Sequence, residues 1–461
     1  MYLREIHIEN IRGFDEVHLD LDRGGGKYAG WTVIAGPNGT GKSTLLRAIA
    51  LSVAGPSMAA KLQMSYAGWI REGEDKGLVK TQLDSDVRDW IGGEPTDQRV
   101  ERWTALQWLK TDGPEPTVSA PLDLDLLQSQ LPEERGPWDS NPSDWFIAGY
   151  GPFRRIGLRE DYDTPGPQMA ARLMSLFNED YTLAESIHWL KEIHARRLDY
   201  QEQVRRGPAE PQHIMHLNDL EYEAKSLGYL RDGVLALLDD GLFVDGTRIA
   251  RFDMSGLWVE QAGRTMPLRS LSDGYRATIA LVFDIVRQIH RCSPYLSILS
   301  STKPVVVAHE GVVLIDEIDA HLHIAWQKRI GFWLKEHFPN IQFIVTTHSP
   351  FICQAADAKG LIRLPALGTD GKAEHVSDED FRTIVNGGAD EAALTALFGL
   401  EHAHSDASEK NRTRVAQLEA IVIRGAASAE DQAELEQLLK ALPDTGSAMV
   451  ERVLRKHEAL R

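Results

Sequence analysis

The chain contains the stretch Gly36-Pro37-Asn38-Gly39-Thr40-Gly41-Lys42-Ser43, which matches the pattern G-x-x-x-x-G-K-[ST]. An apolar run, Trp31 to Ala35, precedes this stretch, and residues of helical composition, Thr44 to Ala50, follow it. The pattern is informative in this context of strand, loop and helix. The sequence therefore predicts a P-loop, a glycine-rich turn that binds the phosphates of a nucleotide.

The residue types in this loop suit that chemistry. Glycine lets successive backbone N–H groups turn toward phosphate oxygens at the positive end of the following helix. Lys42 should reach the β- and γ-phosphate oxygens, and the Ser43 hydroxyl should ligate Mg²⁺. The residues of this region that we expect to contact ATP are Gly36, Asn38, Gly39, Gly41, Lys42, Ser43 and Thr44.

A second motif, rich in acid, lies far along the chain. Val312 to Ile315 is an apolar run typical of a buried strand, and Asp316 and Glu317 follow it directly. Paired with a P-loop, this run is typical of a Walker B strand: Asp316 would hold Mg²⁺ through water, and Glu317 would orient or deprotonate the attacking water. Asp316 lies 273 positions after Ser43 (316 − 43), so a large insertion separates the two halves of the site.

Length and charge limit the classes of protein that this chain can be. Its 461 residues allow about two to four domains, and 43% apolar with 26% charged residues is typical of a globular chain. Fifty Lys and Arg against 68 Asp and Glu give a net charge of −18. This excess of acid argues against diffuse attraction to DNA or to an anionic bilayer, so any DNA contact would need a local basic patch or a partner.

The sequence lacks the features of membrane and secreted proteins. Met1 to Ile6 shows no charged region followed by an apolar stretch, and no run of about 18 apolar residues occurs. The two cysteines, Cys292 and Cys353, are too few for a disulfide framework or a four-cysteine zinc site. We therefore expect a cytoplasmic protein with no membrane segment.

The P-loop, the Walker B strand and the insertion between them resemble the RecF and SMC branch of the ABC ATPases. The resemblance extends to Leu271-Ser272-Asp273-Gly274-Tyr275, which is similar to the ABC signature L-S-G-G-Q and precedes a helical stretch, Arg276 to His290. It implies that Ser272, Gly274 and the start of this helix bind the γ-phosphate of ATP held by a second subunit. The alternative for Ser272 and Asp273 is an ordinary helix N-cap.

Three shorter elements resemble the same branch. Asp319 lies in Ile318-Asp319-Ala320-His321, at the position of the D-loop. His348 follows an apolar run at the position of the switch histidine, where an imidazole could reach the γ-phosphate and act in catalysis. Arg12 lies in Asn10-Ile11-Arg12, which resembles an N-terminal element whose arginine contacts nucleotide; the alternative is a surface arginine in a β-hairpin.

The Q-loop of the branch has no clear counterpart. The strand-like run ending at Tyr150 is in the right place, but no glutamine follows it closely, and Gln168 lies too far along the chain. Arg154 and Arg155 follow this run instead. They could contact phosphate or an effector, or form a solvated pair.

Two clusters in the sequence contain residue types that can bind metals, but we do not expect either to be catalytic. His321 and His323 could form a metal pair, but a third ligand is not nearby in sequence, so we favour solvent-facing or dimer-interface residues. Asp378-Glu379-Asp380 resembles the acidic pair of a Toprim nuclease domain, but the residues from Ser377 onward have a helical pattern. A solvated helix start is the expectation, and an intrinsic nuclease is disfavoured.

The predicted fold is α/β, an ABC-type P-loop ATPase core with an antiparallel β-subdomain, an inserted helical lobe and a helical C-terminal tail. We expect the first half of the core in residues 1–160, the lobe in 161–240, the second half of the core in 241–376 and the tail in 377–461. The tail carries apolar stripes at helical spacing, which could pack internally or dock a partner.

Three further details resemble the compact ABC ATPases of phage-defence systems, such as the Septu and retron-associated ATPases. They are Leu-Ser-Asp-Gly-Tyr-Arg from Leu271, Gly-Tyr-Gly-Pro-Phe-Arg-Arg from Gly149, and the tail segment Leu397 to Leu400. The resemblance implies a homodimer or higher even oligomer that buries two Mg-ATP and acts as a switch on an effector nuclease or toxin. The alternatives are a DNA-repair or chromosome-maintenance ATPase that clamps DNA directly, and a nucleotide-binding scaffold that scarcely hydrolyses.

Overall fold

The computed structural model describes residues 1–86, 99–121, 138, 145–154, 168–183, 185–206, 214–243, 245–293, 296–365, 371–402 and 404–442. Contacts along the chain divide it into two units, Met1–Ala392 and Ala393–Arg461. Every residue predicted to bind the nucleotide belongs to the first unit, which therefore contains the candidate site.

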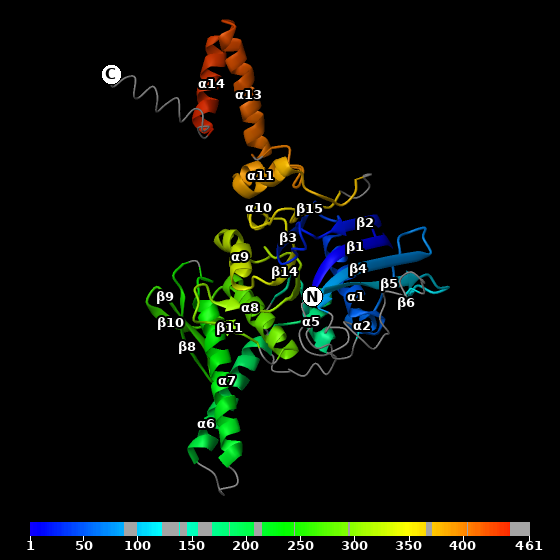
Figure 1. The fold of residues 1–461 in the computed structure, drawn as a ribbon. Helices are drawn as coiled ribbons and strands as arrows, with labels where there is room; N and C mark the ends of the chain where they lie inside the picture. The colour runs from blue at the N-terminus through cyan, green and yellow to red at the C-terminus, as the bar shows by residue number, and fades with distance from the viewer. Residues whose placement is uncertain are drawn as a thin grey trace. The chain divides into compact units, whose positions relative to one another are not determined.

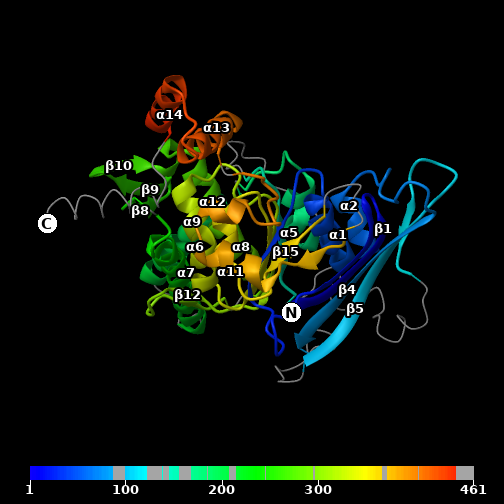
Figure 2. The ribbon, with the colours of Figure 1, turned by 90° about the horizontal axis from the view of Figure 1, so that it is seen from above.

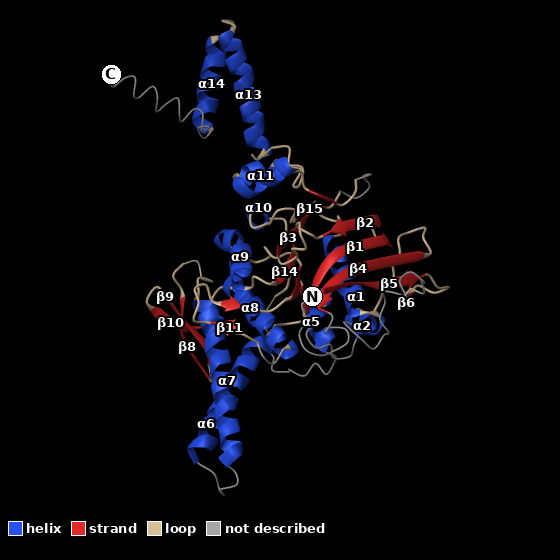
Figure 3. Cartoon of the chain, in the orientation of Figure 1, coloured by secondary structure: helices blue, strands red, loops and turns tan. Residues whose placement is uncertain are grey.

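A largely parallel sheet carries both predicted phosphate-site strands. Its strand order is β16-β15-β3-β14-β13-β7, and all neighbours pair in parallel except β15 and β16. Its central strands are buried along nearly their whole length, as expected for strands that are covered on both faces. Strands β3, β14 and β15 of this sheet are labelled in Figure 3. The strands are β3 (Gly30–Ala35), β7 (Ile147–Tyr150), β13 (Gly311–Ile315), β14 (Ile341–Thr346), β15 (Leu361–Arg363) and β16 (Glu374–His375).

A second, antiparallel sheet has the order β2-β1-β4-β5-β6. The predicted hairpin at the N-terminus is confirmed, with His7 opposite His18 and Ile8 opposite Val17. Helices α1 (Lys42–Ala54) and α2 (Pro56–Leu62) lie along this sheet (Figure 2), and apolar residues of both sheets and α1 share one core. The strands are β1 (Tyr2–Ile11), β2 (Phe14–Asp20), β4 (Lys76–Asp86), β5 (Arg99–Leu109) and β6 (Thr117–Ser119).

The insertion contains a long helical hairpin. Helix α5 (Gln168–Phe177) packs against β7, and α6 (Glu185–Arg206) and α7 (Ile214–Asp239) then pack against each other and project from the sheet region (Figure 1). The break predicted at Gly207-Pro208 lies outside the described residues. A three-stranded antiparallel sheet follows, made of β8 (Arg248–Asp253), β9 (Gly256–Gln261) and β10 (Arg264–Pro267).

Short and long helices complete the first unit. The 3₁₀ turn η3 (Leu268–Ser270) leads into α8 (Asp273–Cys292), and α9 (Ile324–His337) links β13 to β14. The remaining elements are β11 (Ile298–Leu299), β12 (Val306–Val307), α10 (Pro350–Cys353), α11 (Asp378–Asn386) and α12 (Ala389–Ala393). The α/β core, the antiparallel sheet, the inserted helices and the helical C-terminal residues confirm the predicted fold class.

The second unit is a helical hairpin in its described part. Helices α13 (Asp406–Ile423) and α14 (Ala429–Ala441) pack on each other, and Arg414 donates two hydrogen bonds to the Glu434 carboxylate. Leu418, a member of the apolar stripes predicted in the tail, is fully buried. Other members of the predicted stripes remain exposed, namely Leu394, Leu400, Val422 and Leu439.

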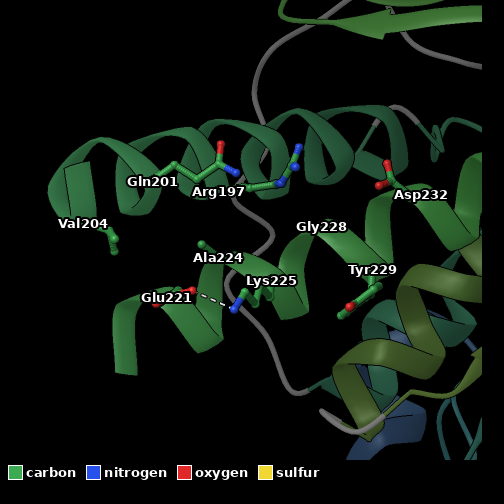
Figure 4. A pocket seen from close by; sticks show the side chains of 9 residues that line it. All are labelled: Arg197, Gln201, Val204, Glu221, Ala224, Lys225, Gly228, Tyr229 and Asp232. Carbon is green, nitrogen blue, oxygen red and sulfur yellow. Dashed lines mark hydrogen bonds and ion pairs between the residues drawn. The ribbon is translucent and has the colours of Figure 1, made fainter. Parts of the chain in front are cut away.

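A cleft of about 460 Å³ lies between α6 and α7 (Figure 4). Its walls include Arg197, Glu221, Lys225 and Tyr229, and none of its lining residues was predicted to bind the nucleotide. The P-loop and the Walker B acids lie instead at the strand ends of the parallel sheet.

Candidate nucleotide-binding site

The P-loop connects β3 to α1 as predicted. Gly41 has a φ of 90°, a left-handed conformation that favours glycine, and a Cβ atom there would lie 2.6 Å from the Phe14 ring. A Cβ on Gly36 would lie 2.8 Å from the Leu364 carbonyl oxygen. The loop is thus packed between the β1–β2 hairpin and the segment after β15, and its glycines are needed for both backbone shape and space.

Lys42 is buried and turned back onto its own loop. Its Nζ donates hydrogen bonds to the carbonyl oxygens of Gly36, at 2.9 Å, and Pro37, at 3.0 Å. Burial lowers the pKa of Lys42, while the carboxylates of Asp316, Glu317 and Asp319 act in the opposite direction. Strands β3 and β13 both pair in parallel with β14, so the P-loop after β3 and the acids after β13 lie at the same edge of the sheet.

The Walker B acids lie at the carboxyl end of β13. Parallel strands end at the same edge of a sheet, so the end of β14 lies beside them, with Ile315 opposite Val345. Thr346 donates from Oγ1 to Asp316 Oδ1 at 2.5 Å and accepts a hydrogen bond from the Glu317 backbone N–H at 2.7 Å. Asp316 is buried and oriented, whereas Glu317 is only partly buried.

A second threonine-to-aspartate hydrogen bond joins the D-loop to the switch segment. Thr347 donates from Oγ1 to Asp319 Oδ1. Thr347 Oγ1 also accepts a hydrogen bond from the Ser349 backbone N–H at 2.9 Å. Between them, the side chain of His348 is exposed. The structure thus brings His348 to the sheet edge that carries Asp316, Glu317 and Asp319.

Arg154 contradicts both alternatives offered by the sequence. It is 3% exposed, so it is not part of a solvated pair, and its guanidinium contacts backbone carbonyl oxygens rather than an open surface. Arg155 lies outside the described residues. The carbonyl oxygens that accept from Arg154, at 2.9 to 3.4 Å, belong to Gly151, Asp316, Glu317, Ile318 and Ala320.

This buried arginine fixes the backbone of the Walker B exit and the D-loop. Burial lowers the pKa of Arg154 to about 10, against the opposing effect of the carboxylates of Asp319, Asp316 and Glu317. An arginine just after the neighbouring strand was the available signal. The sequence could not reveal its role, because all its acceptors except the Gly151 carbonyl are main-chain oxygens more than 160 positions away.

The signature segment begins helix α8, three residues before the predicted helical stretch. Ser272 occupies the N-cap position with an extended backbone, yet its side chain makes no capping hydrogen bond and is exposed. A Cβ on Gly274 would lie 2.7 Å from the His321 carbonyl oxygen. The exposed start of α8 therefore lies against the loop that follows the Walker B acids.

Helix α8 is also tied to β7 through a buried polar cluster. The Tyr150 hydroxyl donates to Asp284 Oδ2 at 3.0 Å, and Arg287 donates to Asp284 Oδ1 at 2.7 Å. Burial, followed by the adjacent Asp284 carboxylate, raises the pKa of Tyr150. The Tyr150 carbonyl oxygen accepts from the Asp316 backbone N–H at 2.7 Å, so the same residue contacts the signature helix and the Walker B segment.

Arg12 lies beside the first turn of α1. It has a φ of 51° in the β1–β2 turn, its Nη1 donates to Thr44 Oγ1 at 3.4 Å, and its guanidinium stacks over Trp69 at 5.2 Å from the ring centroid. Arg12 is thus an exposed arginine in a β-hairpin, as the alternative stated, and it also lies beside the P-loop helix.

The remaining sequence predictions fall outside the candidate site. His323 caps α9, where its Nδ1 accepts from the Ala325 backbone N–H at 3.3 Å, and His321 has a φ of 66° in the preceding turn. Asp378, Glu379 and Asp380 form the first turn of α11 behind the Ser377 N-cap, which confirms the predicted helix start.

The fold and this arrangement define a P-loop nucleotide-binding protein. A family model described as "AAA domain, putative AbiEii toxin, Type IV TA system" matches residues 113–354, more than half of the chain, and one described as "AAA domain" matches residues 5–89. The chain belongs to the AAA-domain family of the first description.

Similar proteins include Septu and retron-associated ATPases. The chain is 26% identical to the Septu protein PtuA of Bacillus mycoides over 76% of its own length and 38% of that protein. It is 40% identical to the Retron Ec83 probable ATPase of Escherichia coli over 23% of its own length and 18% of that protein. The resemblance to Septu and retron-associated ATPases is confirmed, and the chain spans well under half the length of either relative.

A solved structure, an SMC head bound to the C-winged helix domain of ScpA, is similar to this chain at 16% identity and a TM-score of 0.46. The match covers 82% of this chain and 98% of that one. In the part of the chain that the structure describes, no helix is both long and apolar enough to cross a membrane.

Proposed function

We propose that this protein binds and hydrolyses ATP and that the bound γ-phosphate controls its association with a second copy. The observation that carries the proposal is that the P-loop after β3 and the acids after β13 lie at one edge of the parallel sheet, on either side of β14. A cation that binds phosphate and acids that bind magnesium or activate water are the two halves of a phosphoryl-transfer site.

The donor set suits magnesium. Asp316 offers a carboxylate held by Thr346, and Ser43 offers a hydroxyl at the start of α1; both are the hard oxygen ligands that Mg²⁺ prefers. Ser43 and Asp316 would hold the ion, which would neutralise charge on the phosphate oxygens. Lys42 would exchange its two loop carbonyls for β- and γ-phosphate oxygens.

Glu317 is the candidate base. Its partly buried carboxylate would accept the proton of a water molecule as that water attacks the γ-phosphorus, and the bond to the β–γ bridging oxygen would break to release ADP and phosphate. Arg154 and Thr346 hold the backbone on either side of Glu317, so they would keep the carboxylate in position during the reaction. His348 would donate a hydrogen bond to the γ-phosphate.

The second copy would supply the signature segment. Ser272 is exposed at the start of α8, where unpaired N–H groups and the helix dipole favour an anion. With ATP present, the partner's helix start would complete the site, and hydrolysis would remove the γ-phosphate that favours the closed dimer. We further propose, from the Septu and retron names of its relatives, that this switch controls an effector nuclease or toxin in phage defence.

The test measures phosphate release and mass in solution together. The purified wild-type protein should release phosphate from Mg-ATP. The Glu317→Gln variant, in which hydrolysis is slowed, should shift toward a dimer when ATP is added, as measured by light scattering. A wild-type protein that releases no phosphate would overturn the hydrolysis proposal. A Glu317→Gln variant that binds ATP but stays monomeric would overturn the switch.

A further inference from the structure

A group of three metal-ligand side chains lies on the β1–β2 hairpin, outside the nucleotide site. Among the described residues, Glu5, His7 and His18 are the one set of three or more His, Cys, Asp or Glu side chains with ligand atoms within 4.8 Å of one another. His7 and His18 are directly opposed across the two strands. Glu5 lies two positions before His7 and so projects from the same face.

The spacing of the ligand atoms suits a tetrahedral ion. His7 Nε2 lies 3.3 Å from Glu5 Oε2, and His18 Nε2 lies 3.5 Å from the same oxygen. Ligands about 2.0 to 2.1 Å from a tetrahedral zinc ion are about 3.3 Å from one another. We propose that Glu5, His7 and His18 bind a divalent transition metal of the zinc class, with water as the fourth ligand.

The side chains are free enough to adopt the geometry that the ion needs. The two imidazole rings now stack, with centroids 4.0 Å apart and planes inclined by 23°, so they must turn for both Nε2 lone pairs to converge. His7 is 33% exposed and His18 is 55% exposed, which leaves room for that turn and for access of the ion. The Trp103 ring also lies beside His7, with ring centroids 5.2 Å apart and planes inclined by 64°.

The donor set also decides the class of ion. Two imidazoles and a carboxylate favour zinc and its transition-metal neighbours over magnesium, which prefers oxygen ligands alone.

A bound ion would link the two strands of a functional hairpin. Their turn carries Arg12, which contacts Thr44 at the start of the P-loop helix. A link between His7 on β1 and His18 on β2 would limit separation of these strands, and it would stabilise the folded chain by mass action. The site thus lies on the element that presents Arg12, although its binding does not depend on ATP hydrolysis.

Calorimetry of the full-length protein with ZnCl₂, in excess Mg²⁺ and without nucleotide, tests the proposal. One ion should bind per chain, and His7→Ala and His18→Ala should each weaken binding at least tenfold. His188→Ala is the matched control, because His188 also pairs with a glutamate, Glu192 at 3.2 Å, but is not in a group of three ligands. This variant should bind like the wild type.

A second measurement does not rely on variants. Co²⁺ bound to wild-type protein should give the intense visible absorption of a tetrahedral site, and Zn²⁺ should abolish it. Wild-type protein with neither a zinc isotherm nor this absorption would overturn the proposal. Unchanged binding by the folded His7→Ala and His18→Ala variants would overturn it as well.

Discussion

The hydroxyl of Tyr150 donates a 3.0 Å hydrogen bond to the carboxylate of Asp284, so the last residue of β7 is bonded to the middle of helix α8. Both groups are buried, and Asp284 also holds Arg287. The helix that begins with the signature segment is thereby attached to the strand beside the Walker B motif.

Removal of this hydroxyl should destabilise the protein. Tyr150→Phe leaves the ring in place but takes one donor from a buried carboxylate, which should lower the free energy of unfolding by about 1.5–3 kcal/mol. Chemical denaturation monitored by circular dichroism measures the change. Tyr229→Phe, on a side chain that is 77% exposed, is the control and should leave stability unaltered. Equal stability of the two variants would show that the hydrogen bond contributes little.

Lys42→Ala should abolish ATP binding. The substitution removes the buried ammonium that faces the three acids, and with it the charge that offsets the triphosphate. Calorimetric titration with ATP should give no measurable heat, while Lys110→Ala, which removes an exposed lysine paired with Asp75, should bind normally. Wild-type affinity in the Lys42 variant would contradict the assignment of the P-loop.

Glu317→Gln should slow hydrolysis by a factor of about 10²–10⁴ while keeping ATP bound. The amide preserves the shape of the side chain but cannot take the proton from water. Phosphate release under single-turnover conditions measures the rate. Glu336→Gln alters an exposed acid on α9 and should leave the rate unchanged. Hydrolysis at the wild-type rate in the Glu317 variant would move the base elsewhere.

Arg154→Lys should lower the rate of hydrolysis with little change in ATP affinity. Lysine keeps the charge but has no planar fork, so it cannot bridge Gly151 and the carbonyls from Asp316 to Ala320 together. Hydrogen exchange should show faster exchange of the amides in residues 316–322, which reports the loss of positioning even without catalysis.

Arg248→Lys, at an exposed position on β8, serves as the control for the arginine variant. It should match the wild type in both rate and exchange. Slow exchange and a normal rate in Arg154→Lys would show that the other contacts suffice to hold the D-loop.

A chain that ends at Ala392 should still hydrolyse ATP. All the candidate phosphate and magnesium residues lie within Met1–Ala392, which forms its own contact unit. The exposed apolar side chains of the second unit, such as Ile423 and Leu439, are candidates for effector docking. Affinity purification from the native host should therefore recover an effector with the full chain only. Recovery of that effector with the shortened chain would place its docking surface in the first unit.

The phosphate site was predictable from sequence because its parts are local motifs. Asp316 directly follows β13, His348 lies two residues after β14, and Lys42 ends the loop that follows β3; parallel strands deliver such residues to one sheet edge. The family resemblance of Asn10-Ile11-Arg12 suggested a nucleotide contact for Arg12, and Arg12 lies beside Thr44 at the start of α1. Their catalytic and binding roles remain predictions.

Other features depend on pairings that no local pattern encodes. The sequence suggested that Arg154 contacts phosphate or an effector, or belongs to a solvated pair, because most of its carbonyl acceptors belong to a segment far along the chain. His7 and His18 form a pair only through the register of β1 and β2. Tyr150 and Asp284 are 134 positions apart, and their hydrogen bond forms only because β7 and α8 pack together.

The hydrogen bonds from Lys42 to Gly36 and Pro37 make nucleotide binding an exchange of partners. The Lys42 ammonium already donates to two neutral oxygens before a triphosphate arrives, so two of its three N–H donors must change partners for all three to reach phosphate oxygens. Arrival therefore includes a local rearrangement, which should keep association slower than diffusion alone would allow. The contribution of Lys42 to ATP affinity is therefore the difference between its hydrogen bonds to anionic phosphate oxygens and its hydrogen bonds to the two carbonyls.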